Sequence, residues 1–272
     1  GEKAFYECAN ITELTIPHNV SYIDYNAFYG CSSISSVIWN AKKCNDFSNW
    51  YGSSLFLNST DNLTSFIFGD SVQHIPSYLC YYMKNLTTIE IPYGVTSLGE
   101  GTFQGCESLD SIIWNAKVCK INSYNTKIPF DYNVVTSFVL GDSVELIPDY
   151  LCYRMNLTSI TIPSTVTQIG KQAFYNCSNL DTIICNALTP PTLDTECFYG
   201  VSSNIDIYIP CGTLSSYSSQ MGWRAFSNFI EPQSEYRITL TSNNSSYGST
   251  NIEKNNACEM AQISATANSG YQ

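Results

Sequence analysis

The sequence predicts a β-rich solenoid in which short parallel strands stack rung upon rung, closed by a short helical cap and followed by a small β module. A 23-residue unit recurs from residue 1 to about Pro210, and its best copy, IPSTVTQIGKQAFYNCSNLDTII, spans Ile162 to Ile184. Each copy ends in a short segment of alternating apolar residues, which is typical of a half-buried strand. A fixed period of this size means that each unit buries its apolar face against its neighbours only.

We predict about nine rungs of roughly 23 residues, whose strands join in one parallel sheet. In the fourth rung, Leu86, Ile89 and Ile91 face the core, whereas Thr88 and Glu90 face outward. Nine rungs at strand spacing would make a sheet about 40 Å long. The predicted strand segments are Ile11 to Ile16, Ile34 to Trp39, Leu63 to Phe68, Leu86 to Ile91, Leu109 to Trp114, Val135 to Leu140, Leu157 to Ile162, Leu180 to Cys185 and Ile205 to Ile209.

Proline and glycine mark the turns between these segments. Proline follows several of the strands directly, because it ends a strand at a position that donates no ladder hydrogen bond. The Val-Thr-x-Ile-Gly motif then predicts a second, shorter extended piece, closed by a glycine that can take a positive φ. The prolines are Pro17, Pro92, Pro163 and Pro210.

A second periodicity groups the rungs in threes. Asp70-Ser-Val recurs 72 residues later at Asp142, and Trp39-Asn-Ala-Lys recurs 75 residues later at Trp114. The unit after each Asn-Ala is longer or less regular, at residues 41–69, 116–141 and 187–210. Insertions in one rung type fall on one face of a solenoid. The first two carry aromatic residues that either bind a ligand or patch the core, namely Phe47, Trp50, Tyr51, Tyr124, Phe130 and Tyr132.

The repeat stops after residue 210. Apolar residues from Cys211 to Glu231 recur at mostly helical intervals, which predicts a cap over the apolar end of the solenoid, with a short helix after Gly212. We therefore divide the chain into a solenoid (1–210), a cap with its linker (211–234) and a partial β-rich module (235–272). In the module we expect one strand from Tyr236 and another around Ala261 to Ala267.

The first residues match the middle of a repeat. Gly1-Glu-Lys-Ala-Phe5 corresponds to Gly170-Lys-Gln-Ala-Phe174. We therefore expect that this chain is a processed or trimmed piece of a longer protein, with its export signal and anchor outside the segment.

Composition narrows the function classes. The net charge of −11, with no basic stripe, argues against nucleic acid or an anionic membrane surface as a partner. The sequence contains no run of eighteen apolar residues, so it predicts no membrane-spanning helix. Few charges and many Tyr and Phe residues favour a β-rich extracellular protein.

Twelve cysteines raise the question of disulfides or metal. Cys8, Cys31, Cys106 and Cys177 share one repeat position, and others replace Phe or Trp, so we predict buried free thiols that act as small apolar residues. Cys8 and Cys31 would stack about 5 Å apart, so a disulfide between these two residues is the one alternative. No pair has C-x-x-C spacing, and the two histidines lie in different repeats, so we expect neither a metal site nor a cofactor.

The repeat resembles a known family. Val166-Thr-Gln-Ile-Gly-Lys-Gln-Ala-Phe-Tyr-Asn-Cys-Ser-Asn-Leu, with weaker copies at 95–109 and 20–34, is similar to the BspA-type leucine-rich repeats of bacterial surface proteins. Residues 211–231 resemble the segment that often follows such arrays, and residues 236–271 resemble internalin-like β-repeat modules. The resemblance implies an exported, right-handed leucine-rich-repeat horseshoe associated with adhesion. It implies no catalytic residue.

The candidate binding site is the outward face of the strands. Its first position mostly carries a hydroxyl group and its second mostly a β-branched apolar residue, which either reflects β propensity or makes a flat contact strip. The residues are Ser36, Ile38, Ser65, Ile67, Thr88, Glu90, Ser111, Ile113, Ser137, Val139, Thr182 and Ile184. The candidate loop residues are Trp50, Tyr51, Tyr124 and Tyr132, as interface anchors or sugar platforms.

Three functions remain open, all of them non-catalytic. We see no nucleophile, base and orienting group in one neighbourhood, which disfavours an enzyme. The first hypothesis is a cell-surface adhesion protein that binds a host or microbial macromolecule, with a protein or glycan partner on another cell or matrix. The alternatives are a structural spacer that presents another domain, and a glycan-binding module. The oligomeric state stays open.

Overall fold

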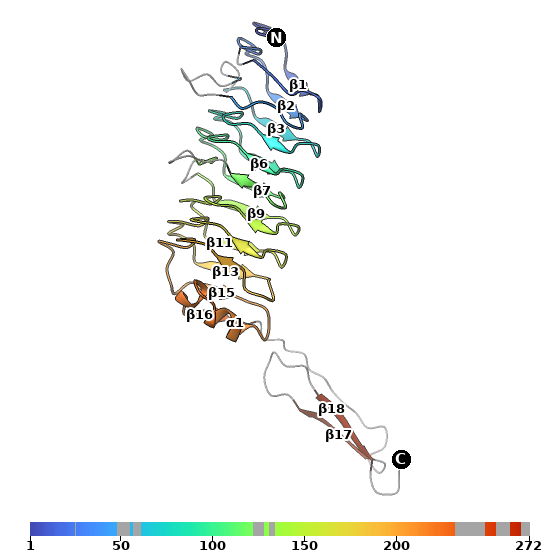
Figure 1. Ribbon diagram of the computed structural model, residues 1–272, viewed down its shortest axis with the longest axis vertical. Coiled ribbons are helices and arrows are strands. Elements are labelled where there is room, and N and C mark those ends of the chain that lie inside the picture. Colours follow the sequence, from blue (N-terminus) through green and yellow to red (C-terminus); the bar gives the residue numbers. More distant parts are fainter. Residues whose placement is uncertain are drawn as a thin grey trace.

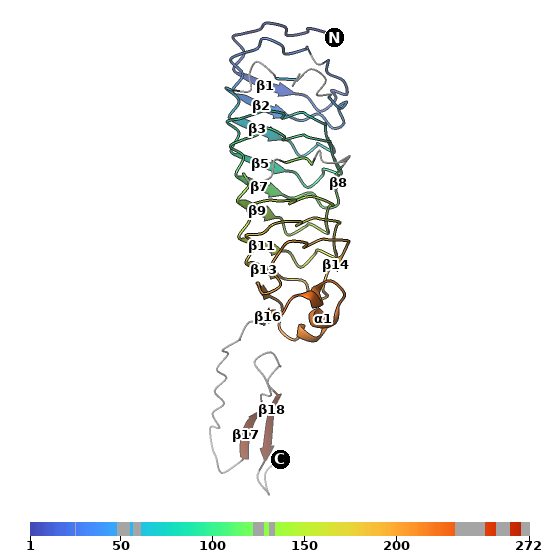
Figure 2. The same cartoon turned by 90° about the vertical axis from the view of Figure 1, so that its left-hand side faces the viewer.

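The computed structural model describes residues 1–24, 26–47, 55–56, 61–121, 128–130 and 134–231, together with the backbone of residues 248–253 and 262–267. Figures 1 and 2 show an extended stack of turns with almost no helix. The stack has about nine turns, with one long strand in each. The predicted solenoid is therefore confirmed. The reason is the 23-residue period, which returns the same apolar positions to the same place in each turn.

The long strands match the predicted segments but begin about two residues later. They are β1 (Glu13–Ile16), β2 (Ser36–Trp39), β3 (Ser65–Phe68), β5 (Thr88–Ile91), β7 (Ser111–Trp114), β9 (Ser137–Leu140), β11 (Ser159–Ile162), β13 (Thr182–Cys185) and β15 (Asp206–Tyr208). Within each sheet, neighbouring strands pair in parallel, and like positions lie opposite one another, such as Ile38 and Ile67. Every second side chain therefore points into a core that runs along the stack.

The prediction of a single continuous sheet is wrong. In the described part of the chain, the long strands form separate sheets in the orders β1-β2-β3, β5-β7-β9 and β11-β13-β15-β16. The two breaks between these sheets therefore lie three strands apart, which matches the longer sequence period. Each break follows a strand with an inward phenylalanine, Phe66 and Phe68 in β3 or Phe138 in β9.

Short strands form on another side of the stack, where the Val-Thr-x-Ile-Gly motif predicted them. They are β4 (His74–Ile75), β6 (Ser97–Leu98), β8 (Lys120–Ile121), β10 (Leu146–Ile147), β12 (Gln168–Ile169) and β14 (Thr192–Leu193). The reason given for the closing glycine is wrong, because neither Gly99 nor Gly170 has a positive φ. A Cβ atom at Gly170 would instead lie 2.6 Å from the Asp149 nitrogen, so glycine permits close approach of two rungs.

The cysteines of the solenoid are free, including Cys8 and Cys31, which are not bridged. Three of them donate an S–H hydrogen bond to a carbonyl of the preceding rung. These bonds join Cys31 to Phe5 (2.9 Å), Cys106 to Cys80 (3.1 Å) and Cys177 to Cys152 (3.0 Å). Cys211, in the cap, is disulfide-bonded, so the prediction of free thiols does not hold there.

Aromatic residues of the insertions fill the core. Phe47 is buried against Trp39 with ring centroids 6.5 Å apart, and Phe130 stacks on Phe103 at 5.1 Å. For these two residues the core-patching alternative is correct, because both stand in rungs that lack the Ala-Phe-x-x-Cys element.

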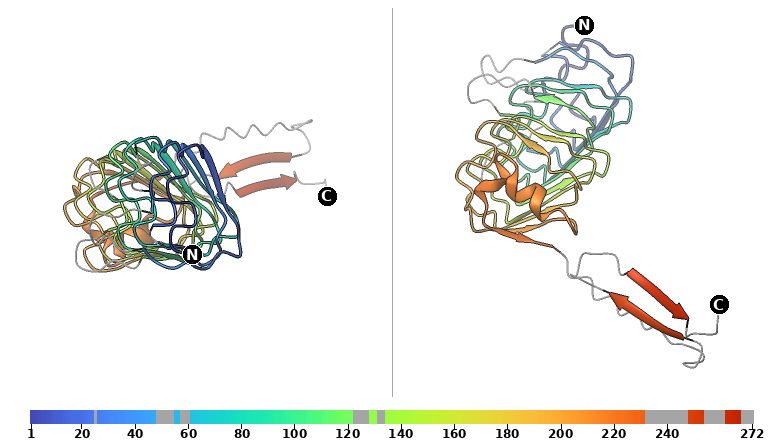
Figure 3. Two further views of the ribbon diagram at one scale, coloured as in Figure 1. Left: turned by 90° about the horizontal axis from the view of Figure 1, so that it is seen from above. Right: turned by 60° about the horizontal axis from the view of Figure 1, so that its bottom comes forward.

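The cap closes the C-terminal end of the solenoid, as Figure 3 shows. It contains α1 (Leu214–Ser219), the 3-10 turn η2 (Trp223–Ala225) and β16 (Asn228–Ile230), which adds a parallel strand to β15. Tyr217 and Trp223 are fully buried. The Tyr217 hydroxyl donates to the Ala187 carbonyl at 2.7 Å, and Trp223 Nε1 donates to the Pro191 carbonyl at 2.8 Å. The predicted short helix is confirmed.

An antiparallel hairpin follows in the described residues beyond the cap. It pairs β17 (Gly248–Glu253) with β18 (Gln262–Ala267). β18 matches the second strand predicted for the module, whereas β17 was not predicted. The strand expected from Tyr236 lies outside the described residues.

Candidate functional site

All twelve predicted face residues lie at the outward positions of the long strands. They form paired rows, because the register places hydroxyl groups opposite hydroxyl groups and apolar groups mostly opposite apolar groups. In the first sheet the rows are Ser36–Ser65 and Ile38–Ile67. In the second sheet they are Thr88–Ser111–Ser137 and Glu90–Ile113–Val139. In the third sheet Thr182 lies opposite Ser159, and Ile184 lies opposite Thr161. The rows thus stand on three sheets instead of one.

The second position is open to solvent in most rungs. Ile67 is 52% exposed and Val139 is 51% exposed, and Ile38 and Ile184 are also exposed, whereas Ile113 is half-buried. Tyr208 lies next to Ile184 in the register and is exposed too. Exposed apolar rows of this kind are what a contact surface requires. The assignment of a ligand to this face stays a prediction.

The strand face contains two hollows. The first, of about 440 Å³, lies at the break between β3 and β5 and includes Ser65, Ile67, Thr88 and Glu90 in its wall. Glu90 there accepts a hydrogen bond from Asn115 Nδ2 at 2.8 Å. The second, also about 440 Å³ and mainly apolar, includes Ile184, Asn186 and Tyr208. The break between sheets, which period-two reasoning missed, therefore creates one of the hollows.

The candidate loop residues are not placed by the structure. Trp50, Tyr51, Tyr124 and Tyr132 lie outside the described residues. Their role as anchors or sugar platforms stays a prediction.

A serine, a histidine and an aspartate meet on the side of the short strands, contrary to our expectation. Ser97 Oγ lies 2.8 Å from His74 Nδ1, and His74 Nε2 lies 3.1 Å from Asp46 Oδ1. Sequence reasoning missed this arrangement because the residues come from three different rungs. The parallel register, which sets His74 opposite Ser97, brings two of them together.

This chain of hydrogen bonds holds the rungs together. Bonds from His74 and from the Ser77 N–H lower the pKa of Asp46 to about 2. An acyl-transfer centre also needs free N–H donors for the oxyanion. Around Ser97 these donors are used, since the N–H groups of Thr96 and Ser97 donate to the Gln73 carbonyl and that of Gly99 donates to Ile75. We therefore assign a structural role to this cluster.

Two further kinds of feature, a cluster of metal ligands and a membrane-spanning helix, are absent from the described residues. No group of three or more His, Cys, Asp or Glu side chains there is arranged to hold a metal ion. No helix in the described ranges has the length and apolar character needed to cross a bilayer.

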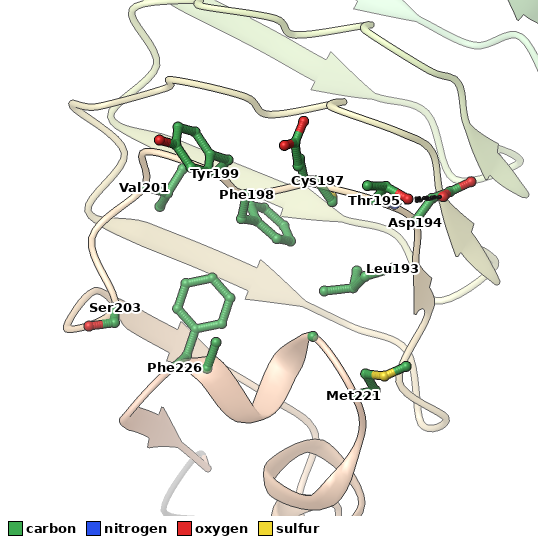
Figure 4. Close-up of a pocket in the computed structure, with 13 residues that line it drawn as sticks. Leu193, Asp194, Thr195, Cys197, Phe198, Tyr199, Val201, Ser203, Met221 and Phe226 are labelled. Atoms are coloured by element: carbon green, nitrogen blue, oxygen red, sulfur yellow. Dashed lines mark hydrogen bonds between the residues drawn. The ribbon is translucent and has the colours of Figure 1, made fainter.

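A third hollow, of about 510 Å³, lies between the last rung and the cap (Figure 4). Leu193, Phe198 and Tyr199 border it from the rung, and Met221 and Phe226 border it from the cap. Phe198 and Phe226 pack edge to face with ring centroids 5.5 Å apart. The hollow exists because the cap covers the core and extends the sheet but does not cover the whole turn of the last rung.

Comparison with known proteins gives one family match. A profile of the BspA type leucine rich repeat region matches the chain in 6 copies, over residues 1–127 and 126–259. No curated protein matches the chain.

Similar solved structures include a leucine-rich repeat protein from Bacteroides ovatus (19% identity, 82% of this chain, 70% of that chain, TM-score 0.37). Another is the pneumococcal vaccine antigen PcpA (13% identity, 82% of this chain, 68% of that chain, TM-score 0.39). A third is a leucine rich cell surface protein from Faecalibacterium prausnitzii (17% identity, 86% of this chain, 83% of that chain, TM-score 0.22).

Proposed function

We propose that this chain, which belongs to the BspA-type leucine-rich-repeat family, is a non-catalytic cell-surface protein that binds a host or microbial macromolecule through its outward strand face. The supporting observation is a set of exposed apolar residues at like positions on the three sheets. They are the pair Ile38–Ile67, Val139, and the pair Ile184–Tyr208. β propensity alone accounts for residue type, but a soluble surface seldom keeps such rows without a contact.

The shape of the face supports a broad partner surface. The rows run along each sheet of long strands, and the hollows at Ile67–Glu90 and Ile184–Tyr208 offer places for protruding side chains. Protein interfaces combine an apolar strip with a few such pockets. We therefore favour a protein over a glycan as the partner.

An extracellular location fits the disulfide bond at Cys211. Disulfides persist in oxidising compartments and are rare in the cytosol. Cys211 is disulfide-bonded, and nine of the ten free thiols in the described residues are buried, which protects them from oxidation.

The test is a charge substitution on the face. Ile67→Glu and Val139→Glu together should reduce binding of the purified chain to host cells or partner bacteria at least 10-fold, measured by flow cytometry. The reason is that a carboxylate left facing an apolar partner surface loses its hydration. Both side chains are half exposed, so circular dichroism should show unchanged folding.

The matched control is Leu188→Glu, which changes a residue that is 73% exposed but lies outside the strand face. It should bind as the unmodified chain does. If the face variant binds equally well, or if the control loses binding to the same extent, the strand face is not the binding surface.

A further inference from the structure

We propose that the hollow between the last rung and the cap docks a peptide segment of a partner protein that adopts the turn conformation of the repeat and carries a basic and an aromatic residue. The site is separate from the outward strand face and goes beyond the function proposed above. Its occupant is defined by free backbone donors, an open aromatic ring face and uncompensated carboxylates.

The first argument comes from the turn segment of each rung, which joins a short strand to the next long strand. In inner rungs this segment donates three N–H groups, at alternate residues, to carbonyls of the following rung. Tyr150, Cys152 and Arg154 donate to Lys171 (3.0 Å), Ala173 (2.8 Å) and Tyr175 (2.7 Å); Gln172, Phe174 and Asn176 donate to Thr195 (3.1 Å), Cys197 (2.9 Å) and Tyr199 (2.6 Å).

In the last rung the equivalent donors are Glu196, Phe198 and Gly200. Within the described chain no acceptor takes the N–H of any of the three. Glu196 (φ 55°) and Gly200 (φ 82°) both keep the positive φ of the equivalent Gln172 (52°) and Asn176 (54°), so the last rung keeps the left-handed turn of the rung before. Three donors at alternate positions match the carbonyls of a segment that repeats this turn, because Thr195, Cys197 and Tyr199 accept the equivalent bonds of the rung before.

The cap leaves these donors free because it continues a different ladder. β16 pairs with β15, with Asn228 opposite Asp206, and so extends the sheet of long strands. Met221, Ala225 and Phe226 approach the turn segment from the cap and leave the hollow of about 510 Å³ between them. That volume is in the range of peptide and small-ligand sites.

The second argument is a stack of tyrosine rings that ends at the hollow. Tyr153 stacks on Tyr175 at 5.1 Å and Tyr175 stacks on Tyr199 at 4.9 Å. Tyr199 is 58% exposed and borders the hollow (Figure 4). Because one face of the ring packs on Tyr175, the other can receive an aromatic side chain of the occupant.

The third argument is charge. The exposed Asp194 and Glu196 line the hollow, and no Lys or Arg is among its lining residues. Glu196 accepts one hydrogen bond from Gln172, which is uncharged and leaves the carboxylate charge in place. A Lys or Arg of the occupant would complement this rim.

The chain itself supplies a probe with this chemistry. Residues 170–177, GKQAFYNC, accept the equivalent three N–H bonds from the preceding rung and include Lys171 and Tyr175. We would titrate a synthetic peptide of this segment, with blocked ends and Cys177→Ser, into the ¹⁵N-labelled chain. The expected result is a saturable shift of the amide protons of Glu196, Phe198 and Gly200. The absence of such shifts at millimolar peptide would overturn the proposal.

Three variants of the full chain sharpen the test. Tyr199→Ala should weaken peptide binding about 2- to 10-fold, the range for one aromatic pair, and Tyr199→Phe should restore it. Ala225→Arg, which fills the hollow from an exposed position and offsets its charge, should abolish binding. Val139→Glu on the strand face should bind the peptide normally, so the two proposals fail independently. Unchanged binding by both Tyr199→Ala and Ala225→Arg would show that the hollow is not the site.

Discussion

At the scale of single residues, the cysteines explain why a thiol suits the solenoid. Burial raises the pKa of Cys177 and of Cys119 to about 12, so both remain protonated at neutral pH. A protonated thiol fills a small apolar space and still donates, as Cys177 does to the Cys152 carbonyl. Serine would lose the apolar contact and valine would lose the donor.

Asp46 allows a prediction about acid stability. Its pKa is about 2 in the folded chain against an ordinary 3.8, so the carboxylate contributes stability above about pH 4, which is lost as the pH falls toward 2. Asp46→Asn should reduce stability at pH 7 by less than about 1 kcal/mol, because the side chain is largely exposed. The acid limb of a stability–pH curve should become shallower in this variant.

The control for this prediction is Asp70→Asn, which removes one charge at an exposed position with no hydrogen bond to His74. Urea unfolding at several pH values measures both variants. An acid limb that is equally steep in the unmodified chain and in Asp46→Asn would show that the Asp46–His74 bond contributes nothing.

At the scale of the rung, close approach of neighbouring turns decides where glycine is required. A Cβ atom at Gly170 would clash with the backbone of Asp149, which cannot move without shifting its rung. Gly170→Ala should therefore destabilise the chain by about 3 kcal/mol or more. Gly212→Ala, where φ is +80° but nothing lies within 4 Å, should cost only about 1–2 kcal/mol.

Thermal or urea unfolding distinguishes these two causes. If Gly170→Ala costs no more than Gly212→Ala, close contact between rungs is not the reason for glycine at position 170.

The three-rung groups differ in the residue that fills one core position. Trp39 and Trp114 fill the same core position in successive groups, and Cys185 takes it in the third. The smaller cysteine leaves room for Tyr217 of the cap, whose hydroxyl lies 3.1 Å from Cys185 Sγ. The third copy of the sequence motif is therefore adapted to end the array.

At the scale of the whole molecule, a stack of this kind is stabilised by contacts between neighbours only. Trp223→Ala should cost about 3–5 kcal/mol, because it removes a fully buried ring and its bond to Pro191. Hydrogen exchange should show the loss of protection first in β15 and β13, while β2 and β7 stay protected. A uniform loss along the stack would mean that the solenoid unfolds as one cooperative unit.

The sequence by itself determined the solenoid, its nine long strands, the residues that face outward and the place of the cap. These properties follow from the 23-residue period and the alternation in segments such as Leu86 to Ile91, which are local patterns. Only the tertiary structure decided where neighbouring strands stop pairing and that Asp46, His74 and Ser97 meet. It also decided that the N–H groups of Glu196, Phe198 and Gly200 find no acceptor among the described residues. The physical reason is that these features depend on the spacing between rungs, which is set by the side chains packed between them and not by the pattern within any one rung.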